Sequence, residues 1–254
     1  MRVHSIFASA IMPALLLLSG CDLPGRPKAE PEVPRPEEVR SFDTLYGENC
    51  SGCHGKAGDN GAATNLANPE YQALIDDASL RDMIANGEKG TLMPGFSKRA
   101  GGPLTDAQID VIVQGMRARW KKADVFVGVT PPPYKAVHPG NASKGQAVYA
   151  AACARCHGAN AQQPGSAGSV LDGTLLALLN EQTLRTTIIA GRPDIGEPDW
   201  RGHISGRAMT DEEITDVTAW MMAQKPATPG QPYPNATPMS DLPNGAQAQG
   251  LKSN

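Results

Sequence analysis

The sequence predicts an all-α protein whose folded part consists of two similar domains in tandem. Three observations lead to this prediction: an internal repeat, a capped helix at the end of each repeat, and no run with the alternating pattern of a β-strand. The repeat consists of three pairs of segments in the same order: FDTLYGENCSGCHG (42–55) with GQAVYAAACARCHG (145–158), LRDMIANG (80–87) with LRTTIIAG (184–191), and LTDAQIDVIVQGM (104–116) with MTDEEITDVTAWM (209–221).

Each half is expected to run from a helix through a CxxCH motif and a long loop to a second helix, a Gly- and Pro-containing loop and a final helix. Thr105 with Gln108, and Thr210 with Glu213, have the spacing of a capping box and predict where each final helix begins. Apolar residues at helical spacing predict the buried faces of these helices: Ile109, Ile112, Val113 and Met116 in the first, and Ile214, Val217 and Met221 in the second.

Proline-rich and polar segments separate the two domains from each other and from the termini. Residues 22–40 predict an extended tether, the PPP run at 131–133 predicts a short stiff linker, and the C-terminal segment lacks apolar periodicity. The predicted organisation is a signal peptide at 1–20, a tether at 21–40, a first domain at 41–123, a linker at 124–141, a second domain at 142–226 and a disordered tail at 227–254.

The N-terminal segment has the features of a bacterial export signal. Arg2 is followed by an apolar run that ends at Leu18 and is too short to span a bilayer comfortably. LSGC (18–21) resembles the lipobox of bacterial lipoproteins, in which the cysteine is acylated and becomes the first residue of the mature chain. The sequence therefore predicts lipidation of Cys21 and attachment to the periplasmic side of a bacterial membrane, and Asp22 favours the inner membrane. The alternative is an ordinary secretory signal with a stray cysteine.

Four further cysteines occur in two CxxCH motifs, CSGCH (50–54) and CARCH (153–157), which match the attachment signature of c-type haem. Thiols three positions apart lie about one helical turn apart, so both can reach the vinyl groups of one porphyrin while the next residue presents its imidazole to the iron. A zinc half-site and a redox dithiol are the alternatives, but the pairs lie in separate repeats without a βαβ context. The sequence therefore predicts two covalently bound haem c groups, held by Cys50, Cys53, Cys153 and Cys156.

Both halves resemble class I cytochrome c domains, over residues 41–122 and 142–225. The order of features typical of that family is a first helix that carries a tyrosine, the CxxCH motif, a loop with Met-Pro and a capped last helix. The resemblance implies that His54 and His157 are the proximal iron ligands and that a loop methionine is the distal one. In the first half this methionine is Met93 of TLMPGF.

The second half has no methionine at the matching place, because Glu197 of EPDWRGHISGRAM aligns with Met93. A carboxylate is an unusual axial ligand of haem, so the sixth ligand is predicted to be Met209, with His203 and an open site as the alternatives. One observation opposes this assignment. Met209 directly precedes the cap of the last helix and aligns with Leu104, and a residue in that place can serve as packing alone.

Several basic side chains lie near the second motif. Arg192, Arg201 and Arg207 form a cluster next to the loop, and we expect them to pair with haem propionates or with the acidic rim of a partner. His138 lies in the predicted linker and could also reach a haem, although a linker histidine is more commonly solvated.

The predicted anchor and haems together indicate an electron carrier. Two haems in adjacent domains form a short relay, and thioether ligation raises the reduction potential, which suits transfer from a cytochrome bc-type quinol-oxidising complex to a terminal oxidase of a respiratory chain. The net charge of −3 gives no indication of nucleic acid binding. The alternative is a dihaem redox enzyme, of the peroxidase or the thiosulfate/nitrite type, with the second haem as catalytic centre. The sequence leaves open whether the protein is a permanent subunit of a larger complex or a mobile tethered carrier.

Overall fold

The computed structural model describes residues 33–160 and 162–226. Within these ranges the chain is helical, with isolated β-bridges and no β-strand, which confirms the predicted all-α fold. None of the described helices is long and apolar enough to cross a membrane. The predicted signal peptide, Cys21 and the tail predicted at 227–254 lie outside the described residues.

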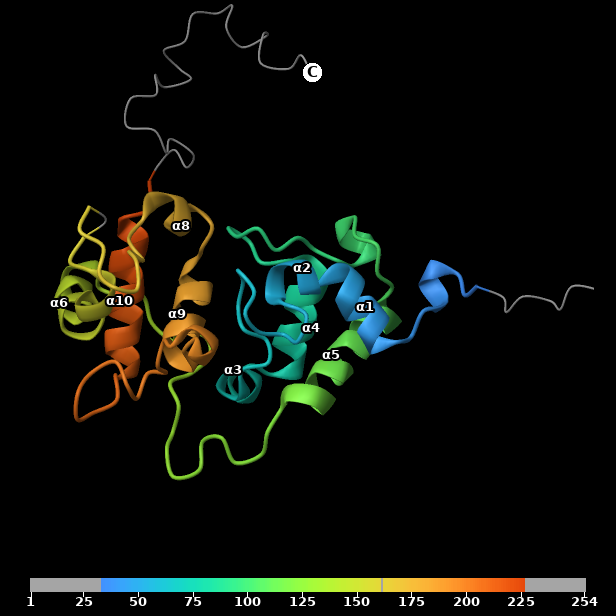
Figure 1. Cartoon of the computed structure of the whole chain (residues 1–254), viewed down its shortest axis with the longest axis horizontal. Helices are drawn as coiled ribbons and strands as arrows, with labels where there is room; N and C mark the ends of the chain where they lie inside the picture. The colour runs from blue at the N-terminus through green and yellow to red at the C-terminus, as the bar shows by residue number, and fades with distance from the viewer. Residues whose placement is uncertain (1–32, 161, 227–254) are drawn as a thin grey trace, which may run out of the picture. The chain divides into compact units, whose positions relative to one another are not determined.

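The two halves form the same series of helices, separated along the chain by the predicted linker (Figure 1). The first half contains α1 (Phe42–Asn49), α2 (Ser51–His54), α3 (Pro69–Leu74), α4 (Asp77–Asn86) and α5 (Asp106–Trp120), with 3-10 helices η2 (Pro36–Glu38) and η3 (Lys98–Ala100). The second half contains α6 (Ala142–Ala152), α7 (Ala154–His157), α8 (Gly173–Ala177), α9 (Glu181–Ala190) and α10 (Asp211–Ala223), with the 3-10 helix η4 (Pro193–Ile195).

The structure adds a short helix, α3 or α8, to each long loop that was predicted to follow the CxxCH motif. The side chain of Asn68 accepts hydrogen bonds from the amides of Glu70 and Tyr71, and Pro69 occupies the first turn of α3. Asp172 caps α8 in the same way. An Asn-Pro pair is a local signal for a helix start, because the amide missing from proline has no partner inside the first turn.

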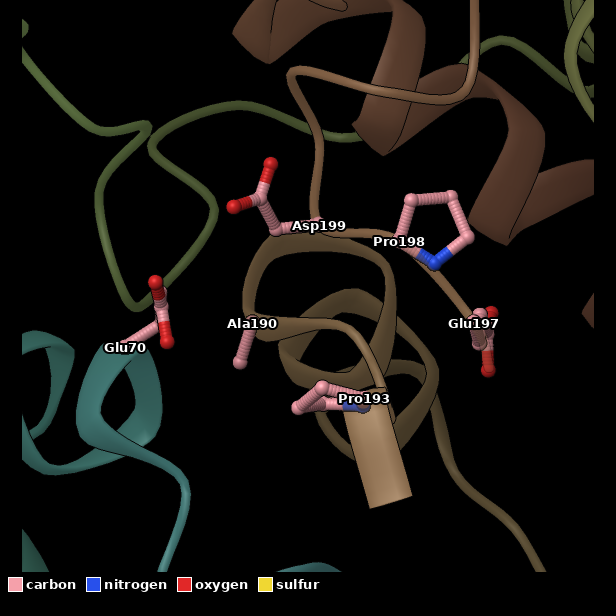
Figure 2. A pocket seen from close by; sticks show the side chains of 6 residues that line it. All are labelled: Glu70, Ala190, Pro193, Glu197, Pro198 and Asp199. Carbon is pink, nitrogen blue, oxygen red and sulfur yellow. The ribbon is translucent and has the colours of Figure 1, made fainter. Parts of the chain in front are cut away.

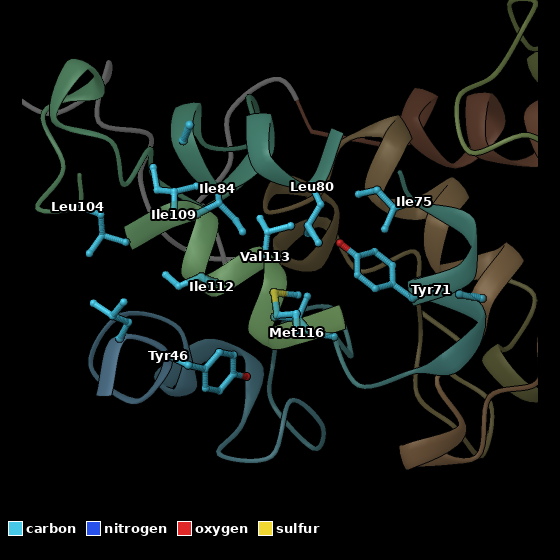
Figure 3. Close-up of a cluster of buried hydrophobic side chains, with 14 residues drawn as sticks. Tyr46, Tyr71, Ile75, Leu80, Ile84, Leu104, Ile109, Ile112, Val113 and Met116 are labelled. Atoms are coloured by element: carbon cyan, nitrogen blue, oxygen red, sulfur yellow. The ribbon is translucent and has the colours of Figure 1, made fainter. Parts of the chain in front are cut away.

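The last helix of each half is built as the capping boxes and apolar faces predict. Both boxes are formed, at the start of α5 and at the start of α10. Figure 3 shows Met116 of α5 in one cluster with Tyr71 of α3 and Leu80 of α4. These side chains are at most 2% exposed, and full burial of one aliphatic side chain contributes about 1.5–3 kcal/mol. The corresponding residues of α10 are also buried: Ile214, Val217 and Met221.

The segments predicted as tether and linker are hydrogen-bonded to the domains that they adjoin. Gln108 Nε2 donates to the carbonyl of Pro36 at 2.7 Å, so the end of the tether lies on the first domain. Arg185 of α9, whose side chain is 3% exposed, donates to the carbonyl of Pro133 through Nε at 3.1 Å and through a terminal nitrogen at 2.8 Å. The linker is therefore fixed on the second domain, because a buried guanidinium requires hydrogen-bond acceptors.

Candidate functional site

Each CxxCH motif forms one helical turn that begins at its first cysteine. In α2 the amides of Cys53 and His54 both donate to the carbonyl of Cys50, at 3.2 and 3.0 Å. Cys153 accepts the same two bonds in α7. The two cysteines and the histidine of each motif thus project from a single tight turn, and no disulfide joins these cysteines in the described part of the chain.

A tyrosine of the preceding helix holds the turn that follows each motif. Tyr46 donates its hydroxyl proton to the carbonyl of Gly55 at 2.8 Å, and Tyr149 donates to Gly158 at 2.9 Å. Gly55 has φ +81°, and a Cβ there would lie 1.7 Å from a backbone oxygen, so only glycine fits this turn. The repeated tyrosine noted in the sequence therefore has a defined role, which is to fix the chain directly after the histidine.

Both predicted proximal histidines are oriented by a backbone carbonyl. His54 Nδ1 lies 2.8 Å from the carbonyl oxygen of Thr64, and His157 Nδ1 lies 3.0 Å from that of Gly168. A bond of this kind fixes the tautomer and leaves Nε2 as the metal-binding nitrogen. With two thiols beside each imidazole, the donor set fits one haem c in each domain.

The distal loop of the first domain presents Met93 after α4. The amide of Glu88 donates to the carbonyl of Met93 at 3.1 Å, and the amide of Met93 donates to the Thr91 hydroxyl at 3.1 Å. Gly87 has φ +79°, and a Cβ there would come within 2.7 Å of the Met93 carbonyl oxygen. The loop is thus fastened closely to the end of α4, with Met93 half-buried against the core.

Glu197 takes the place of Met93 in the second domain. The amide of Arg192 donates to the carbonyl of Glu197 at 3.0 Å, which repeats the bond between Glu88 and Met93. Burial raises the pKa of the Glu197 carboxyl, and the nearby His157 and Arg192 act in the opposite direction. The carboxyl therefore lies in a low-dielectric environment close to the predicted proximal histidine.

Met209 lies where Leu104 lies in the first domain. The amide of Met209 donates to the carbonyl of Trp200 at 2.9 Å, and the amide of Leu104 makes the matching bond to Phe96 at 2.8 Å. Met209 is 3% exposed and Leu104 is 4% exposed, each within the core of its domain. These contacts are the ones expected of a packing residue.

The other predicted candidates near the second motif are His203 and His138. His203 Nε2 lies 3.3 Å from the carbonyl oxygen of Ile188. Burial lowers the pKa of His203, the bond to Ile188 opposes this shift, and the charge of His157 adds to it. His138 is 41% exposed and lies 3.7 Å from Asp211, so it remains at the surface of the linker.

The arginines next to this loop have carboxylate partners within the chain, and their predicted pairing with haem propionates or with a partner protein stays a prediction. Each is paired with at least one carboxylate: Arg192 with Asp194, Arg201 with Asp199 and Glu70, and Arg207 with Glu213. Each arginine has an acidic residue close to it in the sequence, and that proximity could have predicted these ion pairs. Pairs of this kind combine charge attraction with hydrogen bonds, which orients each guanidinium.

The distal loop of the second domain is hydrogen-bonded to the proximal loop of the first. Arg192 donates to the carbonyls of Ala63 and Gly61 at 3.1 and 3.0 Å. Asn68, which caps α3, donates to the carbonyl of Ala190 at 2.8 Å. The same loop holds His54, and the charge of Arg192 lowers the pKa of His54, although burial is the larger cause. Sequence reasoning missed this contact, because its acceptors are main-chain carbonyls that leave no pattern in the sequence.

A pocket of 260 Å³ lies at this contact, lined by Glu70, Ala190, Pro193, Glu197, Pro198 and Asp199. Figure 2 shows Glu197 and Asp199 on either side of Pro198, with the Asp199 carboxylate on the side of Glu70 and the Glu197 carboxylate away from it. Arg201 joins Glu70 to Asp199 across the contact. Arg201 thus forms ion pairs with both carboxylates on this side of the pocket, Glu70 and Asp199. Glu197 lies on the opposite side, close to His157.

Comparison with known proteins agrees with this repeated site. Two stretches, residues 37–114 and 140–221, match a family described as "Cytochrome C oxidase, cbb3-type, subunit III". The comparison with curated proteins returned no match. Among solved structures, the chain is similar to one from the Kuenenia stuttgartiensis reducing HAO-like protein complex Kustc0457/Kustc0458, with 17% identity and a TM-score of 0.42 over 77% of this chain and 100% of that chain.

The two family matches correspond to the two repeats, and each contains one CxxCH turn, one carbonyl-oriented histidine and one distal loop. They cover more than half of the sequence. The chain therefore belongs to the cytochrome family described as cbb3-type cytochrome c oxidase, subunit III, and carries its cytochrome c domain twice.

Proposed function

We propose that this protein is a lipid-anchored dihaem c-type cytochrome that carries electrons from a bc-type quinol-oxidising complex to a terminal oxidase. Its place is the periplasmic side of a bacterial membrane, with the inner membrane preferred. The electron-transfer character follows from the two cytochrome c domains. Haem c supplies a one-electron centre to each domain, held by Cys50, Cys53 and His54 in the first and by Cys153, Cys156 and His157 in the second.

The observation that carries this proposal is the contact between the two haem-binding regions. Arg192 of the second distal loop holds Gly61 and Ala63, in the loop whose Thr64 orients His54. Asn68 adds a buried bond to the carbonyl of Ala190. A partly buried contact made of charged and amide donors keeps two redox sites in one arrangement, as an electron relay requires.

The anchor and the family description support the placement beside membrane complexes. Cys21 at the end of a lipobox would hold the chain on the membrane, and the Pro-rich tether would let its domains reach neighbouring complexes. The matched family is described as a subunit of a cytochrome c oxidase, which supports a terminal oxidase as the acceptor.

Oxidation by membranes tests the proposal. The full-length protein is produced with a c-haem maturation system, reduced, and mixed with a membrane fraction that contains a terminal oxidase. We expect its haem absorbance to return to the oxidised form, at a rate that inhibition of the oxidase abolishes. Re-reduction should follow when quinol and the quinol-oxidising complex are supplied. If neither complex exchanges electrons with the protein, the proposal that these complexes are its partners is wrong.

A redox enzyme with the second haem as catalytic centre is the second candidate. The observation that favours it is Glu197 at the position of Met93, because catalysis needs an iron without a firmly held sixth ligand. The measurement is consumption of peroxide, nitrite or thiosulfate by the purified dihaem protein. We expect no sustained turnover. Turnover at an enzyme-like rate would favour the redox enzyme over the electron carrier.

A further inference from the structure

The two domains present different side chains at the same point of the distal loop. The bond from the Arg192 amide to the Glu197 carbonyl measures 3.0 Å, and that from Glu88 to Met93 measures 3.1 Å. Both loops start at a glycine with positive φ, Gly87 or Gly191, where a Cβ would lie within 2.7 Å of the loop backbone. The backbone bond that holds this position is therefore shared, and the side chain there is a carboxylate in place of a thioether.

Met209 occupies the place of a packing residue in the second domain. Its amide is bonded to the carbonyl of Trp200, and its side chain belongs to the second core at 3% exposure. The matching residue Leu104 has no ligand chemistry and occupies the same place. Met209 therefore fills a packing position, and withdrawing its side chain from the core would leave a cavity.

His203 is also committed elsewhere. Its Nε2 is bonded to the carbonyl of Ile188, whereas His54 and His157 use Nδ1 for such a bond and keep Nε2 free. A ligating histidine generally uses one nitrogen for the metal and the other for an orienting acceptor. His54 and His157 thus offer Nε2 to a metal. In His203, Nε2 faces a carbonyl instead.

We propose that Glu197 faces the sixth coordination position of the second haem, so that this iron lacks a thioether ligand and binds a small neutral ligand of the carbon monoxide type when it is reduced. A carboxylate is a hard oxygen donor, which holds ferrous iron weakly, while the Met93 thioether closes the first site. Carbon monoxide and nitric oxide share the required chemistry. The inference rests on the second haem of the proposed function.

The test uses the dihaem protein and three single variants. Glu197→Met gives the second loop the residue of the first, Met209→Leu gives the second core the residue of the first, and Met93→Leu removes the first thioether. The two readouts are the near-infrared thioether charge-transfer band of the oxidised protein and the stoichiometry of carbon monoxide binding to the reduced protein.

We expect the original protein to show the band of one thioether-ligated haem and to bind one carbon monoxide per chain. Glu197→Met should double the band and abolish carbon monoxide binding. Met93→Leu should abolish the band. Met209→Leu should change neither readout, and it serves as the matched control because it keeps the core filled.

Three results would overturn the inference. They are a band that survives in Met93→Leu, a band that is halved in Met209→Leu, and a reduced protein that binds no carbon monoxide. A haemochrome assay separates this failure from that of the proposed function. One haem per chain would contradict the proposed dihaem relay itself. Two haems with Met209 as a ligand would contradict only the role proposed for Glu197.

Discussion

The guanidinium of Arg192 donates a hydrogen bond of 3.0 Å to the carbonyl oxygen of Gly61. The two residues belong to different cytochrome domains, and each is close to a residue of the candidate sites. Gly61 is in the loop that orients His54, and the backbone of Arg192 holds Glu197. A single side chain thus connects the proximal side of the first site with the distal side of the second.

Replacing Arg192 should loosen the contact between the domains. Arg192→Ala removes one of the donors to Asp194 and the side-chain donor to two carbonyls, and we expect the free energy of unfolding to fall by about 1–3 kcal/mol. Urea denaturation followed by circular dichroism measures this change. The control is Arg207→Ala, which removes an exposed pair with Glu213 and should cost at most about 1 kcal/mol. Equal losses in the two variants would contradict a special role for Arg192.

Acid should weaken the same contact through Asp194. Hydrogen bonds from Arg192, Asn65 and the amide of Asn60 hold the pKa of the Asp194 carboxyl well below its usual range. Since the folded pKa lies below the unfolded one, the ionised carboxyl stabilises the fold above the unfolded value of about 3.9. This contribution is lost as the pH falls below that value towards the folded pKa.

The corresponding experiment is thermal unfolding as a function of pH. The melting temperature of the original protein should fall more steeply below about pH 4 than that of Asp194→Asn, which carries no charge to lose. Above this pH the original protein should be the more stable of the two. Parallel curves for the two proteins would show that Asp194 contributes nothing to the pH dependence.

The mature protein should contain two covalent haems, one for each CxxCH turn. Cys153→Ser should remove the second and leave the first, because each motif binds its haem within its own domain. Mass spectrometry of the intact chain, with a haemochrome assay, measures the number of haems. A variant that loses both haems would mean that the domains do not load independently.

Lipidation of Cys21 should be the main attachment to the membrane. Cys21→Ala should be exported as a soluble protein with a full complement of haem, because the haem-binding residues lie in the two domains and not in the tether. Fractionation of cells followed by haem staining measures the distribution. Retention of this variant on membranes that are washed without detergent would indicate a second anchor or a tightly bound partner.

The sequence alone determined the features that depend on residues close to one another in the chain. The two CxxCH turns, the capping boxes at Thr105 and Thr210 and the apolar faces of α5 and α10 all follow from spacing within one or two helical turns. Two copies of one pattern can be aligned without any structure. This alignment located Met93 in the first repeat and showed that Glu197 stands at the matching position of the second.

The tertiary structure decided the features that depend on which distant groups meet. Spacing could not show that the Met209 amide bonds to Trp200 and that its side chain lies in the core as Leu104 does, and the ligand role of Met209 stays a prediction. The contact of Arg192 with Gly61 could not be read from the sequence, because every residue carries a main-chain carbonyl. Only the folded chain selects the carbonyls that face this half-buried guanidinium.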